Sequence, residues 1–266
     1  MNNYNRFLER KSVLLGLIIF IIVAGTFVYN QRVTARLQED GTLVLSVADE
    51  NTGVSYIIGI DNLNNEVNGM IEYDRSSANG IKQYREFNNQ ELAKILQNNM
   101  DSVASIPVKI TFNRPLNQVE FTKFIKQYAI GVKYYTIYML EPDGKIATIQ
   151  GSPSDTELVP IEFFNTATTS ISQEYNTSAE FLGWVEVEGT VEVNHISEVK
   201  ADQRVFLIDV MQLFLESKLT EESLVQAGVA PSTRRELLKV GFTEIYRAPL
   251  AWELYHWGLM ELGEQE

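Results

Sequence analysis

Three glutamates at even-numbered positions of one short segment are the most regular set of chemically active side chains in the sequence. Glu186, Glu188 and Glu192 lie in the segment WVEVEGTVEV (184–193), where they alternate with valines. A period of two residues predicts a β-strand with the carboxylates on one face. Such an acidic row could bind Ca²⁺ or a cationic surface. The same pattern is typical of the solvated face of a half-buried sheet, which is the interpretation that we favour.

Two other motifs match known sites only in part. Residues 61–72 (DNLNNEVNGMIE) have the length of a calcium-binding loop, but Leu63 replaces a ligand and Glu66 replaces the glycine of the sharp turn. We therefore expect a polar surface loop there. Ser197 and Lys200 have the S-x-x-K spacing of serine β-lactam enzymes, but the companion S-D-N and K-T-G motifs are missing. We expect them on an exposed helical turn.

The chain offers few other groups for catalysis or metal binding. It has no cysteine and two histidines, His195 and His256. The lack of cysteine excludes disulfides, Cys-ligated zinc, iron–sulfur clusters and thiol catalysis. His195 has acidic neighbours and could act as a base, but a lone histidine is more often an ordinary surface or boundary residue. We therefore predict no catalytic residue, no bound metal and no cofactor.

Aromatic residues near the C-terminus form a candidate partner-binding site. Trp252, His256 and Trp257 lie in a segment that we expect to be the final amphipathic helix. Trp252, Tyr255 and Leu259 would share one stripe of this helix, while His256 and Trp257 would project elsewhere. Aromatic residues on two faces could mean one buried face and one face for a partner. Burial of the whole cluster is the alternative, and it is the commoner outcome for such residues.

The elements that would position these residues fall into three segments, 31–106, 107–210 and 211–266. In the first segment, residues 42–47 and 54–60 are predicted strands. A helix is predicted at the end of that segment, over residues 89–100, where the apolar residues have helical spacing.

The second segment predicts a β-α-β-β order. Strands are expected at residues 108–112, 132–140 and 146–150, and the sequence Glu-Pro-Asp-Gly-Lys predicts a hairpin between the last two. Asn117 and Glu120 have the spacing of a capping box at the start of the intervening helix. That helix carries one apolar stripe, which consists of Phe121, Phe124, Ile125 and Tyr128. We therefore expect an α+β fold with a mixed sheet.

Two further patterns complete the outline of the chain. Residues 205–210 are a continuous apolar run, which predicts a central buried strand. The third segment, 211–266, is predicted to be helical. Residues 220–229 and 233–242 align at an offset of 13, and each predicts a short helix with a threonine cap and a glycine stop.

An apolar run near the N-terminus predicts membrane anchoring. Residues 12–29 contain no charge, and at 1.5 Å per residue they would span about 27 Å of bilayer. We assign 1–11 as a short cytoplasmic tail and 12–30 as a transmembrane signal-anchor helix. A signal peptide cleaved after Ala35 is the alternative, in which case the protein would be secreted. The basic residues of the tail weakly favour a cytoplasmic N-terminus and an extracytoplasmic remainder.

The charge composition of the chain limits the classes of partner that it could bind. The formal net charge is −13, with 22 basic and 35 acidic residues, which argues against nucleic-acid binding. We therefore expect a non-enzymatic, single-pass envelope protein whose acidic outer part is a subunit, scaffold or accessory factor. Its partner would be another protein or a second copy of the chain. Two alternatives are an anchored carboxylate-dependent hydrolase of glycan-type substrates and a ligand-sensing module that works through a separate membrane partner.

Overall fold

The computed structural model describes residues 31–37, 42–49, 53–61, 64, 66–99, 105–141, 145–160, 180–226, 229–242, 244–246 and 254–260. They form an α+β protein with two largely antiparallel sheets and several helices, as the sequence predicts. The chain divides into two compact units, each containing one sheet. The units are Met1–Tyr73 with Leu215–Arg247, and Asp74–Phe214 with Ala248–Glu266.

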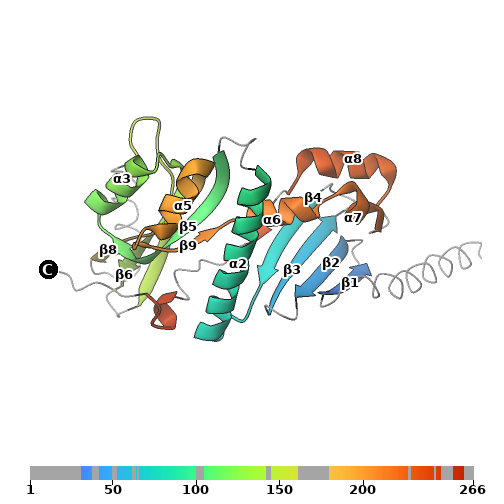
Figure 1. Ribbon diagram of the computed structural model, residues 1–266, viewed down its shortest axis with the longest axis horizontal. Coiled ribbons are helices and arrows are strands. Elements are labelled where there is room, and N and C mark those ends of the chain that lie inside the picture. Colours follow the sequence, from blue (N-terminus) through green and yellow to red (C-terminus); the bar gives the residue numbers. More distant parts are fainter. Residues whose placement is uncertain are drawn as a thin grey trace, which may run out of the picture. The chain divides into compact units, whose positions relative to one another are not determined.

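The first unit is built on a meander of four antiparallel strands in chain order, shown in blue to cyan in Figure 1. They are β1 (Gln31–Leu37), β2 (Thr42–Asp49), β3 (Val54–Asp61) and β4 (Glu66–Glu72). The short strand β10 (Glu244–Tyr246) adds to β4 in parallel. The strands predicted at 42–47 and 54–60 are confirmed as β2 and β3. The surface loop expected at 61–72 is wrong, because most of that segment is β4.

One face of this sheet forms the core of the first unit. Ile58 of β3 and Val67 of β4 are fully or almost fully buried there. Gly69 of β4 lies on the same face, and a Cβ atom at this position would lie 2.9 Å from side-chain atoms of both Leu215 and Phe242. The absence of a side chain at Gly69 therefore lets residues from far along the chain pack directly on the strand.

Two short helices of the first unit pack together. They are α7 (Glu221–Gln226) and α8 (Pro231–Val240). Thr220 caps α7 as predicted, since its hydroxyl accepts a hydrogen bond from the Ser223 amide at 3.1 Å. The predicted cap at Thr233 is wrong: α8 already begins at Pro231, a residue suited to the first helical turn. Gly241 ends α8 with a φ of 72°, as predicted.

The second unit contains a five-stranded sheet in which every neighbouring pair is antiparallel. In spatial order its strands are β7 (Ile146–Gly151), β6 (Gly131–Leu140), β8 (Glu180–Glu192), β5 (Ser105–Leu116) and β9 (Val205–Asp209). The prediction of a mixed sheet is wrong, because β8 inserts between β5 and β6 and no parallel pair forms. With α3 (Gln118–Gln127) after β5 and α5 (Val193–Ala201) after β8, this is the split βαβ, or ferredoxin-like, order plus the hairpin strand β7.

Helix α3 packs on the second sheet through its predicted apolar stripe. Phe121 and Phe124 are fully buried, and the Phe121 ring stacks on Trp184 of β8 with centroids 5.0 Å apart. The capping box is confirmed. The Glu120 amide donates to Asn117 Oδ1 at 2.9 Å, and the Asn117 amide donates to Glu120 Oε2 at 3.2 Å.

Strand β9 is buried but lies at an edge of its sheet, so the central position predicted for 205–210 is wrong. A fully buried side chain of α2 (Ala78–Asn99) covers this edge. The Asn88 side-chain amide donates to the Ile208 carbonyl, and Asn88 Oδ1 accepts from the Val210 amide at 2.9 Å. One asparagine thus takes the place of a neighbouring strand, which is why an apolar strand can end the sheet here.

Helix α2 begins earlier than its sequence pattern predicts. The pattern places the start at residue 89, whereas the helix starts at Ala78. The turn before it explains the difference: the Ser77 hydroxyl accepts from the Gly80 amide at 3.1 Å and so caps the helix.

No helix in the described part of the chain is long and apolar enough to cross a membrane. The tail 1–11 and the apolar run 12–29 lie outside the described residues, so the anchor stays a prediction.

Candidate partner-binding site

In the C-terminal segment of the second unit, the described residues 254–260 complete a helical turn and then reverse direction. Gly258 has a φ of 62°, and the Leu259 amide donates to the Leu254 carbonyl at 2.7 Å, which closes the turn. Leu254 and Met260 are buried and hold both ends of the turn. The predicted stripe of Trp252, Tyr255 and Leu259 is therefore interrupted between Tyr255 and Leu259, because Gly258 ends the helix there.

This turn presents an exposed aromatic pair, His256 and Trp257. The two rings meet edge to face with centroids 5.0 Å apart. Trp257 is 37% exposed, yet its indole N–H donates to the Arg75 carbonyl at 2.9 Å. The pair therefore combines a fixed orientation with an accessible apolar surface. Trp252, the third residue of the predicted site, lies outside the described residues.

The acceptor of the Trp257 hydrogen bond belongs to a stiff turn. The Asp74 carboxylate accepts from the Ser76 amide at 2.9 Å and from the hydroxyls of Ser76 and Ser77 at 2.5 Å each. These hydrogen bonds hold the pKa of Asp74 below its ordinary value, so the turn keeps its charge and its contacts at neutral pH. The turn therefore provides a rigid support for the indole ring.

Only part of the acidic row of β8 faces solvent. Glu186 is only 1% exposed, while Glu188 is half-buried and Glu192 is exposed. Lys109 Nζ of β5 lies 2.8 Å from Glu186 Oε2, and the Thr111 hydroxyl donates to Glu186 Oε1 at 3.3 Å. The expected solvent-facing position is thus wrong for Glu186, because an adjacent strand supplies partners for its carboxylate inside the fold.

Tyr138 of β6 adds a hydroxyl to this buried polar cluster. Its side chain is fully buried, and its hydroxyl has no hydrogen-bond partner among the described residues. Burial raises the pKa of Tyr138 far above its ordinary value, and the Glu186 carboxylate and Tyr255 raise it further. Sequence reasoning missed this cluster. Its one signal was Lys109, the sole charged residue in the predicted strand 108–112.

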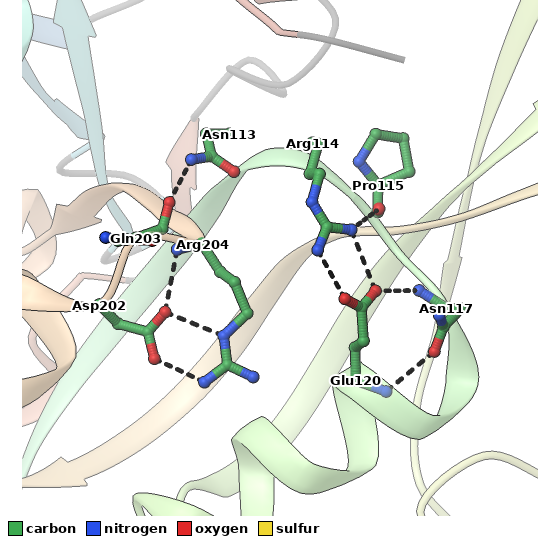
Figure 2. Close-up of polar contacts among 8 residues, drawn as sticks. All are labelled: Asn113, Arg114, Pro115, Asn117, Glu120, Asp202, Gln203 and Arg204. Atoms are coloured by element: carbon green, nitrogen blue, oxygen red, sulfur yellow. Dashed lines mark hydrogen bonds and ion pairs between the residues drawn. The ribbon is translucent and has the colours of Figure 1, made fainter. Parts of the chain in front are cut away.

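A second polar cluster joins β5, α3 and the turn before β9 (Figure 2). Arg114 contacts both carboxylate oxygens of Glu120, at 2.5 and 3.0 Å. Arg204 contacts both oxygens of Asp202, at 2.5 and 2.9 Å, and the Tyr128 hydroxyl donates to Asp202 at 2.8 Å. Each guanidinium thus forms a two-point contact with a carboxylate, which fixes the ends of these elements.

These contacts keep both carboxylates ionised. Hydrogen bonds from Arg204 are the main reason that the pKa of Asp202 falls to about 2. Hydrogen bonds from Arg114 likewise lower the pKa of Glu120. Because each arginine already faces its own carboxylate, we interpret this cluster as a clamp on the fold rather than as a ligand site.

The remaining sequence motifs do not converge on a reactive site. Ser197 and Lys200 are exposed on α5, as expected, and His195 of the same helix contacts Glu198 at 3.4 Å. Asp61 accepts hydrogen bonds from its neighbour Asn64 at the β3–β4 turn. Among the described residues, no group of three or more acidic or histidine side chains could hold a metal ion.

Comparison of the chain with protein families, with curated proteins and with solved structures finds no match. Within the described residues, the His256–Trp257 pair is a candidate binding site that is both exposed and held in place.

Proposed function

We propose that the protein is a single-pass membrane protein whose acidic, extracytoplasmic α+β part binds a partner protein through the His256–Trp257 pair. It would serve as a subunit, scaffold or accessory factor. The observation that carries this proposal is that the Trp257 ring is exposed although its indole N–H donates a hydrogen bond to the Arg75 carbonyl.

A fixed, exposed tryptophan suits protein recognition for two physical reasons. A large ring supplies much apolar area to an interface, and tryptophan is enriched among the residues that dominate binding energy. A ring already held in one orientation loses little conformational entropy when a partner binds. The edge-to-face contact of His256 restricts the pair further.

The start of the first sheet supports an uncleaved anchor. Strand β1 begins at Gln31, two residues after the apolar run 12–29 ends. Cleavage after Ala35 would remove the first five of the seven residues of β1, which pairs with β2 along its whole length. A retained N-terminal segment is therefore consistent with a complete sheet.

The charge of the outer part favours a partner with a basic surface. Without residues 1–11 the chain has 19 basic and 34 acidic residues, a net charge of −15. Such a charge would accelerate encounter with a basic protein and oppose contact with anionic lipid headgroups.

Photocrosslinking at position 257 tests the proposal. A benzophenone amino acid would replace Trp257 in the full-length protein in its own cells, and the matched control would place it at Val119, which is 77% exposed on α3. We expect a discrete adduct with one partner protein at position 257 and none at position 119. No adduct at position 257, or the same adducts at both positions, would contradict the proposal.

A further inference from the structure

The two edge strands of the second sheet differ in whether their outward backbone groups have hydrogen-bond partners among the described residues. The β9 edge is closed, because Asn88 occupies the pairing positions of Ile208 and Val210. At the β7 edge, no described strand pairs with the outer side of the strand. An open edge is a template for another strand unless the protein blocks it.

The described residues of strand β7 lack the charges, prolines and bulges that usually block an edge. Its sequence, IATIQG, contains no charged residue and no proline. Its register with β6 is unbroken from Ile146 to Gly151, so no bulge turns the edge away. One edge strand of the first sheet, β1, differs, since its sequence contains two arginines. The β7 edge is therefore suited to pairing.

The hairpin geometry shows which groups of β7 face outward. The Glu141 amide donates to the Lys145 carbonyl at 2.7 Å, so Lys145 is directed toward β6. Because hydrogen-bonding direction alternates along an antiparallel strand, residues 147, 149 and 151 also face β6. The amides and carbonyls of Ile146, Thr148 and Gln150 then face outward.

We propose that β7 pairs antiparallel with β7 of a second copy of the chain, with the twofold axis at Thr148. This site goes beyond the aromatic pair and does not depend on it. Pairing the three outward residues places Thr148 opposite its own counterpart and Ile146 opposite Gln150, with about six interchain hydrogen bonds. The two five-stranded sheets would become one continuous sheet.

This register is self-complementary. Thr148 opposite Thr148 is a favourable cross-strand pair. Lys145, the charged residue next to the strand, would stand opposite Gly151 rather than opposite another lysine. The side chains of Thr148 and Gln150 are exposed, so no described part of the chain covers them. These features favour a second copy over an unrelated strand.

Single-cysteine crosslinking in the full-length protein tests both the pairing and its register. The chain has no cysteine, so each introduced thiol reports alone. Two Thr148→Cys residues would lie about 5.5 Å apart between Cα atoms, within the range of a disulfide. Two Gln150→Cys residues would be offset by four positions, about 14 Å along the strand, and too far apart to be bridged. Gln150→Cys is therefore the control, since Gln150 is exposed like Thr148.

We expect mild oxidation of native membranes to convert Thr148→Cys into a dimer of twice the chain mass, with Gln150→Cys remaining monomeric. A monomeric Thr148→Cys protein, or equal crosslinking of both variants, would overturn the proposal. An adduct with a different protein would be distinguished by its mass and would likewise overturn it.

Charge substitutions at the proposed axis provide a second test without crosslinking. Thr148→Lys alone or Thr148→Glu alone would place like charges opposite each other, whereas a mixture of the two would place opposite charges there. In detergent, the mixed pair should associate about tenfold more tightly than either variant with itself. Equal association in all three samples, with unchanged circular dichroism, would contradict the twofold axis.

Discussion

Trp257 is the residue on which the binding proposal depends, and its ring and its hydrogen bond can be tested separately. Trp257→Phe keeps an aromatic ring but removes the donor to Arg75, whereas Trp257→Ala removes both. Loss of an anchoring tryptophan costs about 2–4 kcal/mol of binding energy, so Trp257→Ala should weaken partner affinity at least thirtyfold. Trp257→Phe should weaken it less, because the apolar area is largely kept. The affinity of the crosslinked partner, measured by calorimetry, checks this, with Val119→Ala as control.

Asp202 is the residue with the clearest consequence for acid stability. Its folded-state pKa of about 2 lies below the ordinary value of 3.8, so the folded protein binds this proton less readily than the unfolded chain. The resulting stabilisation, about 1–2 kcal/mol after allowance for solvent, is present above pH 4 and is lost as pH falls toward 2. Asp202→Asn should lower stability at pH 7 and flatten the decline between pH 4 and 2. Urea unfolding at several pH values tests this, with the exposed Glu236→Gln on α8 as control.

Sequence patterns predict contacts between residues that are close in the chain, but not contacts between distant segments. Asn117 and Glu120 were predicted correctly because a capping box depends only on residues three apart. Glu186 was misplaced because its burial depends on Lys109 and Thr111, which come from another strand. The hydrogen bond from Trp257 to Arg75 joins residues 182 positions apart, and no local pattern encodes it.

At the level of elements, the edge of β9 depends on one side chain of α2. Asn88→Ala would leave the Ile208 carbonyl and the Val210 amide without their side-chain partner in a buried setting. We expect a loss of about 2–4 kcal/mol in the free energy of unfolding, since each buried group loses a hydrogen bond. Chemical denaturation measures this. Gln90→Ala on the exposed side of the same helix should change stability by less than about 0.5 kcal/mol, and an equal effect of both variants would contradict the role of Asn88.

The close approach of β6 and β8 depends on a glycine. A Cβ atom at Gly189 would lie 2.2 Å from the Gly131 carbonyl oxygen, a backbone atom that can move only with its strand. Gly189→Ala should therefore destabilise the protein by about 3 kcal/mol. Gly59 is also in a strand, but its nearest neighbour to a Cβ would be 3.9 Å away. Gly59→Ala should be close to neutral in thermal unfolding, and a similar loss for both would contradict the packing argument.

Element type was more predictable than element position. Strands β2 and β3 follow from short strand-like runs separated by a turn, β6 follows from its β-branched and aromatic residues, and helix α3 follows from helical spacing; all of these signals are local. The position of β9 at an edge could not be read from its apolar run, because Asn88 hides that edge from solvent. The predicted stripe of the final helix does not continue to Leu259, because the apolar spacing runs through Gly258, where the backbone reverses.

For the whole molecule, the sequence could not reveal how distant segments combine. The first unit takes residues from both halves of the chain, and β10 joins β4 although the two lie far apart in sequence. Segments that are continuous in sequence cannot describe such a unit, because its two parts are separated along the chain by residues of the second unit.

The topology of the anchor is also a property of the whole molecule. In intact cells, or in spheroplasts if there is an outer membrane, a membrane-impermeant maleimide should label Ser197→Cys, which is exposed on α5, but not Asn3→Cys in the N-terminal tail. The reason is that only the part beyond the anchor would face the outside. Permeabilised cells should label both variants. If Asn3→Cys but not Ser197→Cys were labelled before permeabilisation, the orientation would be the opposite of the one that we predict.

The mass and composition of the native particle would show whether the protein forms a dimer that holds a partner protein. The full-length 30.2 kDa protein would be extracted from its own membranes in mild detergent and weighed by native mass spectrometry. We expect a particle with two copies of the chain and a partner protein at fixed stoichiometry, from which Trp257→Ala releases the partner but not the second copy. A single chain without companions, or a particle unaffected by Trp257→Ala, would contradict it.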